Sequence, residues 1–123
     1  MKKKILIIDD QEDLLELTRR VLQSRGYEVL TLNHAEIALE TIKKEFPDLV
    51  LMDMIMPVKD GIQICQEMKS DAAVRHIPVI LTTGQVMEES EYSKEGSTAP
   101  NDYLRKPFEL DELLSKIGNL LLK

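Results

Sequence analysis

The chain has 123 residues and a net charge of −6, from 22 acidic and 16 basic residues. Its length suits a single domain that folds without disulfides or structural metals, and its acidic balance argues against broad binding to nucleic acid or anionic membranes. The one cysteine, Cys65, excludes an intramolecular disulfide, and the short apolar runs predict neither a signal peptide nor a membrane span.

Apolar runs and amphipathic segments alternate in the first part of the chain. An unbroken apolar run predicts a strand near 4–9, buried on both faces, and the next segment predicts a helix over about 11–25. This helix should stop at Gly26, because glycine readily adopts the left-handed conformation common after a helix. The expected buried face of the helix carries Leu14, Leu17, Thr18, Val21 and Leu22.

The middle of the chain repeats this alternation. A second strand near 28–32 precedes a helix over about 34–45, for which Asn33 is the expected N-cap, with Glu36 three residues further on. Pro47 should end that helix, because proline cannot continue the helical hydrogen bonding. A third strand follows near 48–53.

The last part of the chain continues the pattern with a weaker segment in its middle. A third helix follows Gly61 and extends to about Ser70, with one apolar side that carries Ile62, Cys65 and Met68. Strands near 78–83 and 102–105 enclose a fourth helix over about 86–95, which has few apolar residues. The final helix has the clearest apolar stripe, formed by Leu110, Leu113, Leu114, Ile117, Leu120 and Leu121.

Strict alternation of strands and helices predicts one α/β domain over residues 1–123, with a doubly wound parallel sheet. We expect the flavodoxin-like strand order 2-1-3-4-5 with five helices, in which the first and third strands are neighbours. The carboxyl ends of neighbouring parallel strands meet at one edge of the sheet, where ligands bind. This order therefore brings together Asp9, Asp10 and Asp53, which end the first and third apolar runs.

These three aspartates form a candidate metal site. Close carboxylates repel one another, and a hard divalent cation with oxygen ligands removes that repulsion. Mg2+ is the usual cation where a phosphoryl group is also bound. An aspartate after a strand often caps a helix instead, so Asp9 could cap the first helix in place of, or in addition to, binding a metal.

The ends of two further strands add a hydroxyl and an ammonium group. Thr82 and Thr83 end the fourth strand and point to opposite sides, so they compete for the hydroxyl position. Lys106 follows the fifth strand. A carboxylate nucleophile, a cation, a hydroxyl and a lysine together suit phosphoryl transfer to aspartate, in which catalysis depends mainly on positioning and charge neutralisation.

Over essentially its full length the chain resembles the receiver domains of bacterial two-component response regulators, such as chemotaxis regulators. Five motifs in this order, each at the expected strand end, are far more specific than any one alone. The motifs are Ile7–Gln11, Pro47–Pro57, Asp60–Gly61, Thr83–Gly84 and Asp102–Phe108.

The resemblance implies that Asp53 accepts a phosphoryl group from a phosphohistidine, in a reaction that depends on Mg2+. The donor would be a sensor histidine kinase or a histidine phosphotransfer protein. Asp10 and Asp53 would ligate Mg2+ directly, and Asp9 would do so directly or through water. The backbone carbonyl of Ile55 would complete the protein ligands.

The resemblance also implies a conformational switch. Thr83, which the family spacing favours over Thr82, and Lys106 would bind phosphoryl oxygens. Tyr103 lies at the family's aromatic switch position, although static packing of this side chain remains an alternative. The surface around residues 83–108, formed by the fourth helix, fifth strand and fifth helix, would bind a downstream effector. A cis Lys106–Pro107 peptide bond is expected.

We therefore expect a cytoplasmic signalling module that phosphorylates and dephosphorylates itself, is not an enzyme with turnover on an external substrate, and has no direct nucleic-acid or membrane partner. A phosphatase of the haloacid dehalogenase type needs a second aspartate two residues after the nucleophile, where this chain has Ile55. A nucleotide-dependent enzyme is disfavoured, because the sequence contains neither Gly-x-Gly-x-x-Gly nor Gly-x4-Gly-Lys-Ser/Thr, the glycine-rich nucleotide-binding motifs. The complete residue set argues against a phosphorylation-incompetent domain.

The sequence leaves open whether the chain stands alone or is the N-terminal regulatory domain of a larger DNA-binding or enzymatic regulator.

Overall fold

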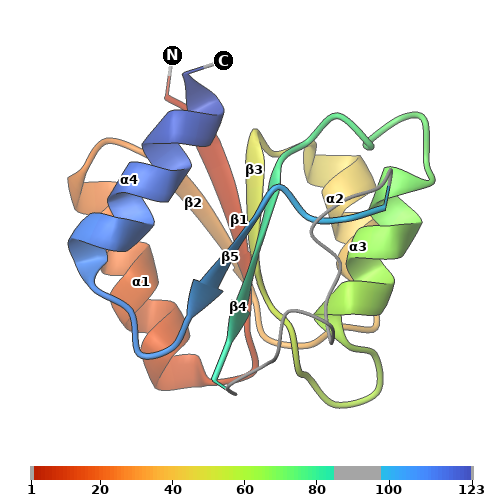
Figure 1. The fold of residues 1–123 in the computed structure, drawn as a ribbon, viewed down its shortest axis with the longest axis horizontal. Helices are drawn as coiled ribbons and strands as arrows, with labels where there is room; N and C mark the ends of the chain where they lie inside the picture. Colours follow the sequence, from red (N-terminus) through yellow and green to blue (C-terminus); the bar gives the residue numbers. More distant parts are fainter. Residues whose placement is uncertain (1, 85–97, 123) are drawn as a thin grey trace.

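The computed structural model describes residues 2–84 and 98–122 and contains a parallel sheet of five strands, with helices on both faces (Figure 1). The strands are β1 Lys4–Ile8, β2 Glu28–Leu32, β3 Leu49–Asp53, β4 Val79–Thr83 and β5 Asp102–Arg105. They pair in the order β2-β1-β3-β4-β5, and every pair is parallel. The predicted flavodoxin-like order is therefore confirmed.

Four helices lie in the described part of the chain. They are α1 Glu12–Ser24, α2 Ala38–Glu45, α3 Gly61–Lys69 and α4 Leu110–Leu121. The helix predicted over 86–95 falls outside the described residues, so α4 corresponds to the helix predicted as the fifth. Among the described residues, no helix is long and apolar enough to cross a bilayer.

The sheet separates two apolar cores. Helices α1 and α4 cover one face, and α2 and α3 cover the other (Figure 1). Successive strand residues point to opposite faces, so Ile5 and Ile7 join the core under α1 and α4, whereas Leu6 and Ile8 join the core under α2 and α3. Burial on both faces explains the unbroken apolar runs of the central strands.

Two details of the helices differ from the predictions. In α1 the side chains of Leu15, Thr18 and Leu22 are buried, whereas that of Leu17 is 56% exposed. The helix is rotated about its axis so that the stripe through Leu15 faces the sheet. In α4, Leu113 and Ile117 are buried, and Leu110 at the start of the helix is 41% exposed.

The predicted cap of α2 is also wrong. The helix begins at Ala38, with Ile37 as the N-cap residue and no side-chain cap. The Asn33 side chain instead donates to Glu12 Oε1 at 3.1 Å, which ties the end of β2 to the start of α1. Gly26 does adopt the left-handed conformation predicted for it, with φ +92°.

The two ends of the described chain approach each other at the edge of the sheet where the strands begin. Lys3, which precedes β1, lines a hollow of about 360 Å³ together with Leu120 and Leu121 of α4. Figure 1 shows both termini at this end of the molecule. The strands run from this edge to the opposite one, where the predicted site residues lie.

Candidate functional site

Three carboxylates meet where β1 and β3 end. The register pairs Ile8 with Met52, so Asp9 and Asp53 leave the sheet side by side. One carboxylate oxygen from each of Asp9, Asp10 and Asp53 lies within 4.8 Å of the others. Asp9 and Asp53 are buried, at 4% and 7% exposure, and Asp10 is exposed. The structure thus brings the three predicted aspartates together.

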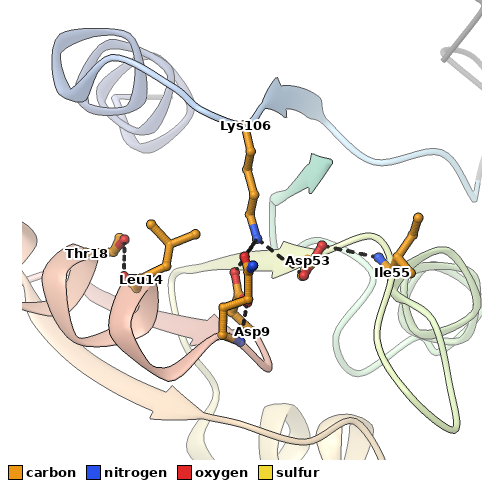
Figure 2. Close-up of polar contacts among 7 residues, drawn as sticks. Asp9, Leu14, Thr18, Asp53, Ile55 and Lys106 are labelled. Atoms are coloured by element: carbon orange, nitrogen blue, oxygen red, sulfur yellow. Dashed lines mark hydrogen bonds and ion pairs between the residues drawn. The ribbon is translucent and has the colours of Figure 1, made fainter. Parts of the chain in front are cut away.

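Lys106 reaches into this cluster from the loop after β5 (Figure 2). Its Nζ donates to Asp9 Oδ2 at 2.8 Å and to Asp53 Oδ2 at 3.3 Å. The side chain is only 12% exposed, so solvent screens these ion pairs weakly. One ammonium balances only part of the charge of three carboxylates, and the cluster can still accept a cation. The peptide bond from Lys106 to Pro107 is cis.

Asp9 does not cap α1 as an N-cap residue. The N-cap of α1 is Gln11, and Asp9 Oδ1 accepts the backbone N–H of Gln11 at 2.9 Å. This bond fixes the turn between β1 and α1, while Asp9 Oδ2 faces Lys106. Asp9 therefore has a local structural bond and still contributes to the acidic cluster.

The carboxyl group of Asp53 lies in an environment that opposes its ionisation. Burial raises the pKa of Asp53 above its ordinary value, and the neighbouring Asp9 carboxylate raises it further. Lys106 and the backbone N–H of Ile55, which donates to Asp53 Oδ1 at 3.2 Å, act in the opposite direction (Figure 2). A bound cation would favour the carboxylate form, which is the nucleophilic form.

The start of α3 packs directly against the end of β3. A Cβ on Gly61 would lie 2.3 Å from the carbonyl oxygen of Asp53, so only glycine fits there without a backbone shift. The N–H of Gly61 donates to the carbonyl oxygen of Met54 at 2.8 Å. Asp60 caps the helix in a reciprocal capping box with Gln63. These contacts fix the backbone that carries Asp53.

The loop between β3 and α3 contains a strained residue. Val58 has φ 73°, and the N–H of Lys59 donates to the carbonyl oxygen of Pro57 at 2.8 Å, which is the bond of a γ-turn. A positive φ is unfavourable for a β-branched side chain. The side chain of Val58 is 81% exposed and gains little packing in return.

The two threonines that end β4 occupy different faces of the sheet. Thr82 lines a small internal hollow together with Asp9 and Asp53. Strand alternation places Thr83 on the other face, the one on which Tyr103 packs against the core under α2 and α3. Both threonines are buried, and the carbonyl oxygen of Thr83 accepts the N–H of Lys106 at 2.7 Å.

An open groove of about 1000 Å³ leads away from the acidic cluster, between the start of α1 and the start of α4. Asp53 and Lys106 line its inner end, and Leu17, Phe108 and Leu110 line its apolar part. The side chain of Ile55, which is 48% exposed, also borders this groove. Asp53 thus lies in the wall of this open groove.

Gln11 contacts Lys106, although no role is predicted for this residue from its sequence pattern. Gln11 Oε1 accepts a hydrogen bond from Lys106 Nζ at 2.9 Å. The only signal in the sequence is its position after Asp9 and Asp10. An uncharged side chain that pairs with a residue 95 positions away leaves no periodic or compositional trace.

Comparisons with known proteins agree with this geometry. The family model described as "Response regulator receiver domain" matches residues 5–118. A "Probable transcriptional regulator ycf27" from Pyropia yezoensis is 37% identical over 126 residues, which cover 98% of this chain and 48% of that protein. The chain thus spans about half the length of this curated relative.

Two solved structures are similar throughout. A putative response regulator from Chloroflexus aurantiacus superposes with a TM-score of 0.90 at 32% identity and with full coverage of both chains. The response regulator protein TrrA from Thermotoga maritima, solved in complex with Mg2+-BeF, gives a TM-score of 0.83 at 33% identity, with 97% of this chain and 99% of that chain covered. With its sheet order, its convergent aspartates and a family match over most of its length, this chain belongs to the response regulator receiver domain family.

Proposed function

We propose that Asp53 is the phosphoacceptor of this receiver domain in a two-component phosphorelay. The supporting observation is that a buried carboxylate at the end of β3 has one oxygen near an ammonium, Lys106, and the other on the backbone N–H of Ile55. An Asp53 oxygen attacks the phosphorus of a phosphohistidine, a P–O bond forms, and the P–N bond breaks. The imidazole leaves and takes up a proton.

Mg2+ is the cofactor that fits the cluster. Three carboxylates within 4.8 Å of one another, with one lysine among them, offer hard oxygen ligands and excess negative charge. Asp9, Asp10, Asp53 and the backbone carbonyl of Ile55 would hold the ion. When bound, Mg2+ neutralises the charge between the acceptor carboxylate and the incoming phosphoryl group.

The proposal includes a conformational response. Thr83 and Lys106 bind phosphoryl oxygens, and Tyr103 fills the space from which Thr83 moves. The register of β4 and β5 supports this coupling, because Leu81 pairs with Tyr103 two residues before Thr83 pairs with Arg105. The surface around residues 83–108 then changes its affinity for an effector, which requires two packings that differ by only a few kcal/mol.

The expected upstream partner is a sensor histidine kinase or a histidine phosphotransfer protein in the cytoplasm. Its phosphohistidine would approach Asp53 along the groove beside α1 and α4. The domain acts as a signalling module, and its own phosphorylation and dephosphorylation are the only reactions that we assign to it. Effector binding rather than turnover of an external substrate is the output.

Phosphorylation by a small donor tests the acceptor directly. Wild-type protein incubated with acetyl phosphate and Mg2+ should gain one phosphoryl mass, stable in acid and labile in base, as measured by intact mass spectrometry. Asp53→Asn should abolish this gain, because an amide is a poor nucleophile. Asp13→Asn, a change of the same kind in the first turn of α1 at the edge of the groove, should retain it. Wild-type labelling of Asp53→Asn would refute the assignment.

A further inference from the structure

The ammonium of Lys106 has three hydrogen-bond acceptors, and one of them carries no charge. Asp9 Oδ2 and Asp53 Oδ2 are carboxylate oxygens, at 2.8 Å and 3.3 Å, whereas Gln11 Oε1 is an amide oxygen at 2.9 Å. An ammonium has three protons, so this set of acceptors is complete. The two carboxylates belong to the acidic cluster, whereas the Gln11 oxygen carries no formal charge and is not one of the expected Mg2+ ligands.

A cation bound by the cluster competes with Lys106 for the same oxygens. Asp9 and Asp53 cannot direct the same oxygen lone pairs at a divalent ion and at an ammonium, and the two positive charges also repel each other. Gln11 is the acceptor in this set that is not needed as a ligand of such an ion. It can therefore keep the ammonium close to the pocket after the carboxylates have turned to the ion.

The backbone of Gln11 is fixed, which makes its side chain an effective anchor. Its N–H is bound by Asp9 Oδ1 at 2.9 Å, and its carbonyl oxygen accepts the N–H of Leu15 at 3.0 Å as α1 begins. Only the side-chain torsions of Gln11 remain to be ordered. Holding Lys106 therefore costs no further backbone entropy at Gln11.

We propose that Gln11 is a positioning residue that acts through Lys106: it holds the ammonium beside the pocket when Mg2+ occupies the carboxylates, and it thereby strengthens Mg2+ binding. This inference rests on the proposed function, because it assumes that the cluster binds Mg2+. The hydrogen bond from Lys106 to Gln11 stabilises the ammonium more in the metal-bound state than in the metal-free state. In the metal-bound state it replaces the two contacts of Lys106 with carboxylates, whereas in the metal-free state those contacts persist.

Calorimetric titration with Mg2+ tests this inference in variants of the full chain. Gln11→Leu should weaken Mg2+ binding by about 3- to 10-fold, the effect expected for loss of one hydrogen bond. Gln11→Glu keeps an acceptor and should bind Mg2+ at least as tightly as wild type. Gln23→Leu is the matched control, because Gln23 Oε1 likewise accepts from a cation in α1, Arg19 Nη1 at 2.8 Å, and its loss should leave Mg2+ binding unchanged.

A double-mutant cycle separates positioning from a structural role in the turn before α1. Lys106→Met should tighten Mg2+ binding by removing the competing cation, and Gln11→Leu should then have no further effect. If Gln11→Leu weakened Mg2+ binding equally in the wild-type and the Lys106→Met proteins, or if it did not weaken binding in the protein that retains Lys106, the inference would be overturned while the magnesium site stayed intact. Absence of Mg2+ binding by wild-type protein would instead overturn the proposed function and the inference with it.

Discussion

Gly61 is a residue whose replacement should disturb the site without removing a charge. A Cβ at this position would lie 2.3 Å from the carbonyl oxygen of Asp53 and 3.1 Å from Met54 Cα, both of which are backbone atoms. Gly61→Ala should therefore displace the end of β3 and lower the free energy of unfolding by about 1–3 kcal/mol, as overpacking typically does. Urea denaturation followed by circular dichroism would measure the change.

Gly118 in α4 provides the matched control. A Cβ there would meet no heavy atom within 4 Å, and the residue lies inside a helix. Gly118→Ala should therefore raise the free energy of unfolding by about 0.5–1 kcal/mol, since alanine loses less conformational entropy than glycine. If both variants were stabilised, the close approach of α3 to β3 would not be the reason for glycine at position 61.

The site residues that could be predicted from the sequence are those that lie at the ends of strands. Asp9, Asp10 and Asp53 end apolar runs, and parallel pairing then makes them neighbours. Gln11 and Val58 could not be recognised in this way. The role of Gln11 depends on where a long side chain from the other end of the chain comes to lie, and the positive φ of Val58 opposes its own intrinsic preference.

At the level of helices and strands, the bounds of the strands were predicted accurately from the apolar pattern alone. The predictions for α1 and α2 were less accurate, because there several side chains could occupy the same buried or capping position. The strands were placed within one residue of their observed bounds, because burial on both faces leaves a simple apolar run. The buried face of α1 was predicted only in part: Thr18 and Leu22 are buried as expected, but Leu15 is buried in place of Leu17, because the many leucines of this helix fit more than one orientation. The start of α2 was placed too early because Asn33 bonds to Glu12 instead of capping the helix.

We expect a measurable response to phosphorylation in the segment that runs from the end of β4 through β5. Beryllofluoride with Mg2+, a mimic of the phosphoryl group, should change amide hydrogen exchange mainly within residues 83–108. Thr83→Ala and Lys106→Ala should reduce these changes. Strand β2, at the other edge of the sheet, serves as the internal reference and should not respond. Changes limited to the loops around Asp10 and Asp53 would argue against transmission through this face.

At the scale of the whole molecule, the acidic cluster lowers stability when no cation is bound. Because the pKa of Asp53 is raised in the folded state, the folded protein binds a proton more readily than the unfolded chain in the pH range just above the ordinary value. Stability falls as the pH rises through that range, and the cost is fully present once the pH exceeds the pKa of Asp53 in the folded state. A bound divalent cation should remove this cost.

Mg2+ should therefore stabilise the fold. At a concentration of 100 times Kd, binding to the folded state contributes about 2.7 kcal/mol, which corresponds to a rise in Tm of roughly 10 °C for a domain of this size. Asp10→Ala removes a proposed ligand that is exposed, and it should abolish most of this rise while changing the metal-free Tm little. Scanning calorimetry at constant ionic strength would separate specific binding from screening. An equal rise in the variant would exclude Asp10 as a ligand.

Lys3 lies close to Leu120 and Leu121, at the edge of the sheet where the strands begin. The five residues of β1 separate this edge from Asp9, a span of roughly 17 Å at the usual rise per strand residue. A fluorescent label, an affinity tag or a sensor-chip linkage attached at either terminus would therefore face away from the acidic pocket. Immobilised protein should keep its pocket open to the solution, so that binding of a partner to Asp53 can be followed on a surface.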